Sequence, residues 1–235
     1  MFTKEKFLSL SHRRRHKNGG LHLRTLYEQK LPLDPHYRTM EAWLKLPPLE
    51  ETSENIIDRF HLHMKEATIS LQEHNLLVKR FDILSDTPFG PVTIYLEDLR
   101  SAFNIGNILR TVEAFRLGTV VFSPNAPYID NPKVEKTAMG TAAIVPTRRG
   151  DLFSLPKPFI ALETVEGAPS IHDFSFPETF SLLLGNEEYG LKKETLRSAD
   201  HIVQIPLIGS KNSLNVASAF SIAAGVISHQ TASYV

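Results

Sequence analysis

Short runs of apolar residues alternate with helix-like apolar periodicity through the second part of the chain. Five runs have the length and composition of buried β-strands, at residues 92–96, 118–123, 159–162, 182–184 and 202–205. After the first run, Asn104 is expected to cap a helix whose apolar face consists of Ile105, Ile108, Leu109 and Val112. Strands that alternate with helices predict an α/β fold, with a mostly parallel sheet and helices on both faces.

The first 90 residues lack this alternation. Residues 31–51 are rich in Leu and Pro, which predicts an irregular segment lying across a surface. Ser53 is expected to cap a helix that runs to about Ile83, with one apolar face made of Ile56, Phe60, Met64, Ala67 and Leu71. Residues 86–91 are typical of a linker. We therefore expect a mainly helical extension over residues 1–90 and a second domain over residues 91–235.

Two loops with glycine and polar residues follow the last two predicted strands. The apolar run 182–184 stops at Gly185, and Gly185 and Gly190 bracket Asn-Glu-Glu-Tyr. Glycine at both ends lets the backbone turn tightly and approach a ligand. A short helix is then predicted over residues 191–200. Because the carboxyl ends of parallel strands form the crevice in which α/β sheets bind ligands, this loop is a candidate binding site.

The second loop follows the strand at residues 202–205. Pro206 and Gly209 interrupt that strand, and residues 210–215 are polar. A final helix is predicted to begin near Ser213. The end of the strand 159–162, at Glu163 and Thr164, is expected to face the same crevice.

Three blocks of residues lie at these predicted strand ends in a fixed order. They are Asn104-Ile-Gly-Asn-Ile-Leu-Arg110-Thr, then Gly185-Asn-Glu187 with Gly190, then Ile205-Pro206 followed by Ser213-Leu-Asn215-Val-Ala. Together they resemble the signature of the SPOUT methyltransferases, specifically the SpoU–TrmH branch, which methylate the ribose 2′-hydroxyl of RNA. The resemblance covers roughly residues 91–235.

The resemblance implies a cofactor, a substrate and an assembly. S-adenosylmethionine would supply the methyl group, tRNA or rRNA would accept it, and no metal would be required. The family's C-terminal segment threads through a loop, which implies a C-terminal trefoil knot that forms the cofactor pocket. A homodimer with active sites near the interface is also implied. Small residues in the last helix, such as Ala217 and Ala223, would allow close approach of another backbone, with tight packing inside one chain as the alternative.

The resemblance also implies roles for individual residues. The implied catalytic side chains are Arg110, Asn104, Glu187, Ser213 and Asn215. Arg110 would prepare the ribose hydroxyl, although a free arginine is a very poor base and helical periodicity alone makes Arg110 a solvated residue. The implied cofactor contacts are Thr164, Gly185, Ile205 and Leu214. Loop amides and carbonyls suit this purpose because they can hydrogen-bond the edge of an adenine.

Charge is distributed unevenly along a chain whose formal net charge is zero. Residues 1–24 contain seven Lys and Arg and one Glu, a net charge of +6, so the rest of the chain carries −6. This basic arm is either an RNA-backbone contact or a solvated, disordered tail. The candidate RNA-binding residues are Arg13, Arg14, Arg15, Lys136 and Arg148, and the last two are equally consistent with a solvated basic edge.

Several classes of protein are disfavoured. There is no cysteine, which excludes disulfides and thiolate–metal sites. No apolar run approaches membrane-spanning length and the N-terminus lacks a secretory core, so we expect a cytoplasmic protein that does not contact membranes. His61 and His63 are two apart on a predicted helix, which favours surface or packing roles over metal binding.

Two other functions compete with RNA methylation. The segment Gly185–Gly190 opens like a phosphate-binding P-loop, but Leu191 stands where lysine belongs, which argues against a nucleotide-hydrolysing enzyme. A non-catalytic RNA-binding protein that keeps the methyltransferase fold is the main alternative. The presence of all five implied catalytic residues argues against it.

Overall fold

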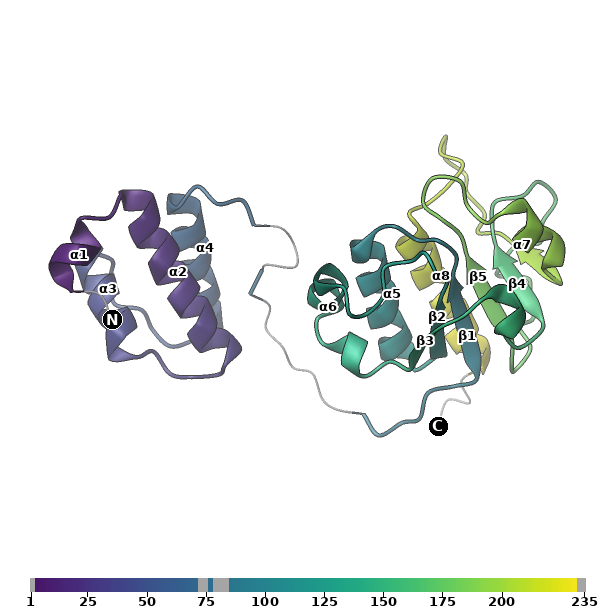
Figure 1. Ribbon diagram of the computed structural model, residues 1–235, viewed down its shortest axis with the longest axis horizontal. Helices are drawn as coiled ribbons and strands as arrows, with labels where there is room; N and C mark the ends of the chain where they lie inside the picture. Colours follow the sequence, from purple (N-terminus) through teal and green to yellow (C-terminus); the bar gives the residue numbers. More distant parts are fainter. Residues whose placement is uncertain (1–2, 72–75, 78–84, 232–235) are drawn as a thin grey trace. The chain divides into compact units, whose positions relative to one another are not determined.

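The structure, a computed structural model, describes residues 3–71, 76–77 and 85–231, in a chain that forms two compact units (Figure 1). Unit 1 spans residues 1–84 and unit 2 spans residues 85–235. Each unit has its own hydrophobic core. No helix among the described residues is long and apolar enough to cross a membrane.

Unit 2 is built on a six-stranded sheet in which every pairing is parallel. The strand order is β3-β2-β1-β5-β4-β6. The strands are β1 (Val92–Leu96), β2 (Gly118–Phe122), β3 (Thr147–Arg149), β4 (Phe159–Leu162), β5 (Ser181–Leu184) and β6 (His201–Val203). This sheet confirms the predicted α/β fold. The strand β3 has the sequence Thr-Arg-Arg, and it had no apolar run by which it could be recognised.

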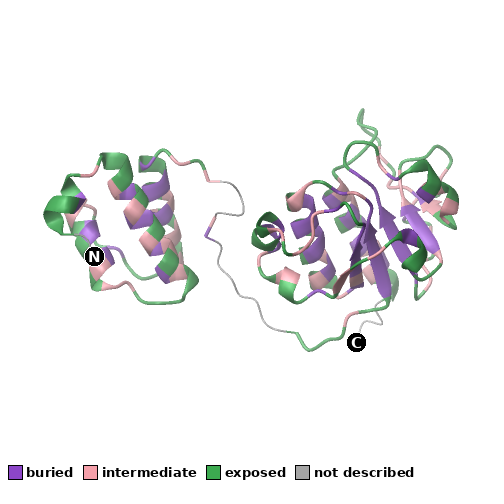
Figure 2. Cartoon of the chain, viewed as in Figure 1, coloured by how far each residue is buried: buried purple, intermediate pink, exposed green. Residues whose placement is uncertain are grey.

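Side chains that alternate along the central strands supply two separate cores. In β1, Ile94 and Leu96 belong to the core under α5 (Ala102–Phe115), α6 (Pro132–Ala138) and α8 (Val216–Thr231). Tyr95 points to the opposite face, where the 3-10 turn η3 (Leu152–Ser154) and α7 (Lys193–Ser198) contribute apolar side chains. Every residue of β1 and β5 is buried (Figure 2), as expected for a parallel sheet covered on both faces.

The helix α7 is shorter than the predicted helix over residues 191–200. Two backbone amides before it are held by acidic side chains, since Leu191 N donates to Glu163 and Lys192 N donates to Glu97. At the other end, Asp200 accepts hydrogen bonds from Lys157 and from the backbone of Phe159. Residues engaged in these contacts lie outside the helix, which is limited to Lys193–Ser198.

Unit 1 contains α1 (Lys4–Leu8), α2 (His12–Glu28), α3 (Pro35–Trp43) and α4 (Ser53–Glu66). The disordered-tail interpretation of residues 1–24 is therefore wrong, because those described belong mostly to α1 and α2 and place Phe7 and Leu23 in the core. The prediction of an irregular segment over residues 31–51 is wrong for residues 35–43, which form α3, and holds for residues 31–34 and 46–51. Asp34 caps α3 by accepting a hydrogen bond from Tyr37 N (2.7 Å), with Pro35 in the first turn.

The helix α4 differs from its prediction at both ends. Thr52, not Ser53, is the cap, and its hydroxyl accepts a hydrogen bond from Asn55 N. The helix stops at Glu66 because Thr68 adopts a left-handed conformation (φ 53°). The predicted continuation to Ile83 is therefore wrong for residues 67–71, and residues 72–75 and 78–83 lie outside the described residues.

Histidine lies in the core of unit 1. His63 on α4 is fully buried, and its two ring nitrogens contact His16 Nδ1 (3.1 Å) and the Tyr37 hydroxyl (3.0 Å). Burial lowers the pKa of His63 to about 3, and the neighbouring His16 and Arg59 act in the same direction. His63 is therefore a neutral, hydrogen-bonded packing residue at physiological pH.

Candidate functional site

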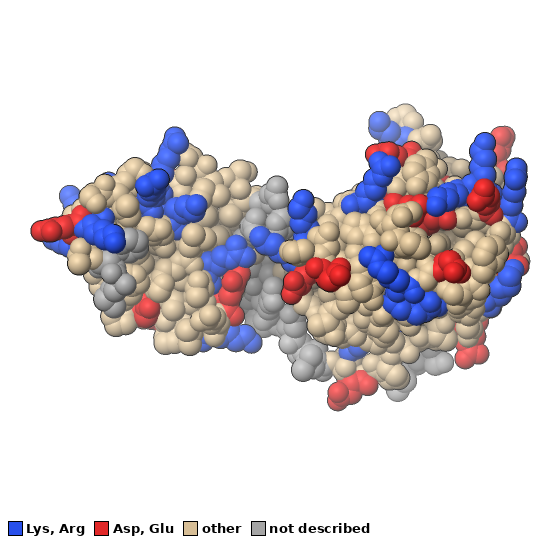
Figure 3. All heavy atoms as spheres, viewed as in Figure 1, with Lys and Arg blue, Asp and Glu red and all other residues tan. Residues whose placement is uncertain are grey.

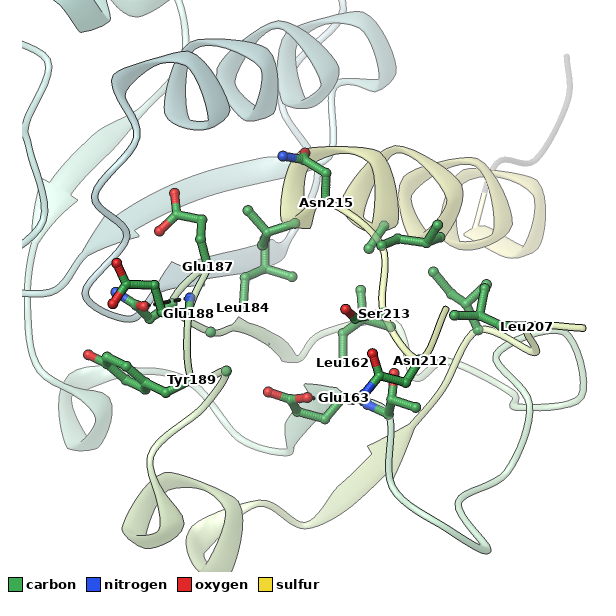
Figure 4. A pocket seen from close by; sticks show the side chains of 18 residues that line it. Leu162, Glu163, Leu184, Glu187, Glu188, Tyr189, Leu207, Asn212, Ser213 and Asn215 are labelled. Carbon is green, nitrogen blue, oxygen red and sulfur yellow. Dashed lines mark hydrogen bonds between the residues drawn. The ribbon is translucent and has the colours of Figure 1, made fainter. Parts of the chain in front are cut away.

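A cavity of about 440 Å³ opens at the carboxyl ends of β4 and β5. Its walls come from these strand ends, the loop 185–190, the segment 205–215 and the first turns of α8. Figure 4 shows Glu163, Asn212 and Ser213 on one side of the opening, and Glu188 and Tyr189 on another. The lining combines leucine side chains with carboxylates, amides and loop backbone, as is usual for small-molecule sites.

The loop 185–190 is a tight hairpin at the edge of this cavity. Asn186 and Gly190 exchange backbone hydrogen bonds of 3.0 and 2.9 Å. Gly190 adopts a left-handed conformation (φ 71°), which favours glycine. A Cβ atom on Gly185 would lie 2.2 Å from the backbone of Gly190 and Leu191, so only glycine fits there without a shift of the loop.

A chain of three polar side chains joins the three sequence blocks. Asn104 Nδ2 donates to Glu187 Oε1 (2.8 Å), and Asn215 Nδ2 donates to Asn104 Oδ1 (3.0 Å). Asn215 also caps α8, because its side-chain oxygen accepts hydrogen bonds from Ala217 N and Ser218 N. Residues separated by more than 80 positions are thus fixed relative to one another beside the cavity.

Glu187 is held as a carboxylate. Its partial burial alone would raise the pKa, but hydrogen bonds from the Arg100 amide, the Asn104 side chain and the Ser101 amide outweigh this and lower it. The ionised form is favoured because each of these donors binds negative charge. Glu187 therefore acts as a fixed acceptor that orients Asn104.

Asn104 has a different role from the one predicted. The helix α5 begins at Ala102, and its cap is Ser101, whose hydroxyl accepts a hydrogen bond from Asn104 N (3.3 Å). Asn104 lies inside the first turn, so its side chain is available for Glu187 and Asn215. Similarly, α8 begins at Val216 and not near Ser213, since Asn215 is its cap.

Most of the cofactor-binding and catalytic residues predicted from the sequence line the cavity, but Arg110 does not. Those that line the cavity are Thr164, Gly185, Glu187, Ile205, Ser213, Leu214 and Asn215. Arg110 follows Asn104 by six positions, about 120° around the helix, and it is exposed without a hydrogen-bond or ion-pair partner among the described residues.

Glu163 is a lining residue to which the sequence patterns assigned no individual role. Its carboxylate accepts hydrogen bonds from Leu191 N (2.7 Å) and Thr164 N (3.2 Å), and it would collide with a Cβ atom on Gly190. Glu163 therefore lies in the cavity wall and holds the end of the hairpin 185–190 through these contacts. Its position directly after a predicted strand was the available signal.

The five candidate RNA-binding residues are dispersed. Arg13 and Arg14 are exposed on α2, and Figure 3 shows basic side chains gathered on the face of unit 1 that is drawn. Arg15 is partly buried, and its Nε has no hydrogen-bond partner among the described residues. In unit 2, Lys136 is exposed on α6, whereas Arg148 bonds to Ser154 beside η3.

Comparison with known proteins identifies relatives of unit 2. The model of the SpoU rRNA Methylase family matches residues 91–225. The 23S rRNA (guanosine-2′-O-)-methyltransferase RlmB of Coxiella burnetii is 30% identical over 65% of this chain and 59% of its own length. RlmB of Neisseria meningitidis serogroup B is 26% identical over 64% of this chain and 61% of its own length. The chain thus spans about three fifths of these relatives.

Solved structures show the same fold. The SpoU methyltransferase AviRb from Streptomyces viridochromogenes superimposes with a TM-score of 0.53 at 25% identity, over 60% of this chain and 59% of that one. AviRb is also known in complex with the cofactor AdoMet. A structure concerned with 2-OH methylation of C/U34 on tRNA matches at 26% identity and a TM-score of 0.54, over 62% of this chain and 93% of that one. The family match, which covers more than half of the chain, confirms the resemblance seen in the sequence: this chain belongs to the SpoU rRNA methylase family.

Proposed function

We propose that this protein transfers a methyl group from S-adenosylmethionine to a ribose 2′-hydroxyl in RNA. The observation that carries the proposal is the Glu187–Asn104–Asn215 chain beside a cavity at the sheet's carboxyl edge. Relatives named as rRNA 2′-O-methyltransferases and the family match support it. No feature of the cavity favours a non-catalytic RNA-binding protein over this activity.

The cavity suits the cofactor in size and chemistry. Its volume lies in the range of ligand pockets, and leucine side chains, including Leu162 and Leu207, provide apolar walls. The tight hairpin at Gly185 and the loop around Leu214 bring backbone groups to the opening, where they would hydrogen-bond an adenine edge. Bound there, S-adenosylmethionine would present an activated methyl group. The protein's contribution is to align that methyl with the ribose oxygen.

The RNA-facing side chains have separable roles. Ser213 at the cavity mouth would position the ribose, and Asn104, Glu187 and Asn215 would fix the surrounding loops. We assign the preparation of the hydroxyl to Arg110, acting through the neighbouring phosphate. A guanidinium is well suited to binding phosphate and poorly suited to taking a proton.

We further propose a homodimer in which Arg110 serves the cavity of the other copy. Arg110 is exposed outside the cavity of its own chain. Apolar and small residues on α8 offer a surface for association: Ile222 is 38% exposed, and no atom lies within 4 Å of a Cβ built on Gly225. The trefoil knot implied by the family, in which the C-terminal segment threads through a loop, remains part of this proposal.

The basic arm is proposed to bind RNA phosphates. Arg13, Arg14 and Lys17 are exposed on neighbouring turns of α2 and have no ion-pair partner among the described residues. They are therefore available to neutralise phosphate, which adds affinity without reading sequence.

The decisive experiment maps ribose-methylated nucleotides in total RNA from cells with and without this gene. We expect at least one 2′-O-methyl site to disappear with the gene and to return with the wild-type copy. Purified protein should bind S-adenosylmethionine in a calorimeter. An unchanged methylation map together with absent cofactor binding would refute the proposed activity.

A further inference from the structure

Three side chains with metal-binding atoms meet where α2 and α4 pack in unit 1. His12 and His16 lie one turn apart on α2, and Glu66 is the last residue of α4. One ligand atom from each residue lies within 4.8 Å of the other two. Spacing of i and i+4 places both imidazoles on the same side of a helix, which is a common arrangement for metal-binding histidines.

The outer pair of this cluster is accessible to solvent. His12 Nε2 and Glu66 Oε2 are 2.8 Å apart, with side chains 58% and 43% exposed. His16 lies beneath them and is 4% exposed. An ion would thus enter from the surface through a short movement of two exposed side chains, and it would meet a third ligand fixed in the core.

The orientation of His16 is set from inside the core. Its Nδ1 lies 3.1 Å from His63 Nδ1, and His63 Nε2 lies 3.0 Å from the Tyr37 hydroxyl. One of the two facing Nδ1 atoms must carry a proton for this contact to be a hydrogen bond. Metal binding requires the arrangement in which His16 Nδ1–H donates to His63 Nδ1 and His63 Nε2–H donates to the Tyr37 hydroxyl, because the Nε2 lone pair of His16 is then free for a metal. Imidazole ligands of metals are usually held in this way, through a hydrogen bond on the other ring nitrogen.

Two glycines in α2 make this arrangement possible. A Cβ on Gly20 would lie 2.3 Å from Met64 Cε and 2.9 Å from His63 Cβ, and a Cβ on Gly19 would lie 3.0 Å from the His63 ring. Adjacent glycines inside a helix cost stability relative to alanine. Their presence here lets α4 approach α2 closely enough for His63 to reach His16.

We propose that His12, His16 and Glu66 bind a divalent transition-metal ion, with Zn²⁺ as the best match. Two imidazole nitrogens and one carboxylate oxygen are typical zinc ligands, and water would complete a tetrahedral site. Mg²⁺ and Ca²⁺ prefer oxygen ligands and fit this set poorly. The ion would link the start of α2 to the end of α4 and so fix the turn that carries Arg13 and Arg14.

This site departs from the sequence-based expectation that no metal is bound. His12 and His16 are separated from Glu66 by 50 or more positions, so their meeting depends on the packing of α2 against α4. The histidine pair at i and i+4 was the signal that the sequence offered.

The test is a calorimetric titration of the full chain with Zn²⁺, after chelator treatment and dialysis. We expect one Zn²⁺ per wild-type chain and no response to Mg²⁺. His12→Ala and Glu66→Gln should each weaken Zn²⁺ binding at least about tenfold, because losing even a hydrogen-bond partner of a metal ligand typically costs that much. Both residues are largely exposed, so these variants should keep the fold, unlike changes at the buried His16.

The matched control is His22→Ala. His22 also pairs with a carboxylate, Asp34 at 2.9 Å, but it lies outside the cluster. Zn²⁺ should raise the melting temperature of the wild type and of His22→Ala more than that of the two ligand variants, because binding to the native state stabilises it. Absence of Zn²⁺ binding by the wild type would mean that His12 and Glu66 share only a hydrogen bond. Undiminished binding by both ligand variants would place the ion elsewhere. Either result overturns the proposal.

Discussion

The two units of this protein place their hydrogen-bonded polar side chains differently. In unit 1, His63 and Tyr37 lie in the middle of a helical core and hydrogen-bond to each other there. In unit 2, most side chains of the central strands are apolar, with Thr93 of β1 and Ser181 of β5 as buried exceptions. The linked polar residues Asn104, Glu187 and Asn215 stand at the sheet's carboxyl edge.

The difference follows from how each architecture provides hydrogen-bond partners for its backbone amides and carbonyls. A parallel sheet pairs its own amides and carbonyls, and the loops at its strand ends retain groups for ligands. Helices packed around a small core instead use side-chain hydrogen bonds to define which faces meet. We therefore expect changes at the sheet edge to affect chemistry and changes on unit 1 to affect RNA affinity.

The largest effect should come from Gly185→Val, which tests whether the sheet edge holds the cofactor. A valine Cβ would lie 2.2 Å from the backbone of Gly190 and Leu191, so the hairpin must move. We expect S-adenosylmethionine binding to be lost in calorimetry, with a lower melting temperature for unit 2. The control is Gly209→Ala, where an added Cβ meets no atom within 4 Å. Wild-type cofactor affinity in Gly185→Val would refute the pocket assignment.

Arg110→Ala should have the next largest effect and should separate chemistry from binding. Turnover should fall roughly a hundredfold or more if Arg110 prepares the ribose hydroxyl. Stability should change by no more than about 0.5 kcal/mol, as for an ordinary surface position. The measurement is single-turnover methyl transfer, with cofactor affinity and melting temperature from the same sample.

Arg197→Ala is the matched control for Arg110, because Arg197 is also an exposed helical arginine of unit 2. It should leave turnover unchanged. Equal turnover of wild type and Arg110→Ala would show that Arg110 is an ordinary solvated residue without a catalytic role.

A smaller effect is expected from the double change Arg13→Ala with Arg14→Ala in unit 1. Deletion of residues 1–24 is a poor test, because it would remove core residues such as Phe7 and Leu23. The double variant should bind RNA more weakly, and the slope of log affinity against log salt should fall by about 0.7–0.9 for each phosphate that is no longer neutralised. Lys65→Ala, on α4, is the control. An unaltered slope would exclude both arginines from phosphate binding.

The smallest effect concerns the pH dependence of unit 2. The pKa of Glu187 is lower in the folded protein than its ordinary value of 4.5. Below pH 4.5 the unfolded chain therefore binds a proton more readily, so the contribution of Glu187 is complete above pH 4.5 and is lost as pH falls through the lowered pKa. The difference in unfolding free energy between wild type and Glu187→Gln should shrink over that interval. A difference that stays constant over this interval would contradict a lowered pKa for Glu187.

Five strands of the sheet in unit 2 were predictable because they contain apolar runs, whereas β3, with the sequence Thr-Arg-Arg, was not. The strand β1 was predicted with its observed bounds, and β4 likewise. The crevice was located from Gly185 and Pro206, since turn residues directly after such runs mark strand ends. The sequence did not reveal that Asn104 would bond to Glu187 and Asn215, because that arrangement depends on the starts of α5 and α8 meeting the hairpin 185–190.

The structure of unit 1 was harder to predict because it depends on contacts between residues that are distant in the sequence. The helix α3 was obscured by neighbouring prolines, although Asp34-Pro35 is a helix start. The burial of His63 has no local signature, since it results from two glycines of α2 that admit the ring. Local periodicity describes helices well, but it does not identify which polar side chains will find partners in a core.

The dispersed origin of the cavity wall has a consequence for how the protein is made. Its lining extends from Leu162 to Ala219, and Asn215 must cap α8 before the polar chain can close. During synthesis the N-terminal part of the chain leaves the ribosome first, and domains tend to fold as they emerge. Unit 1 can thus be complete while the cavity does not yet exist. The nascent protein would hold the helices that we propose bind RNA before it has any place for a methyl donor.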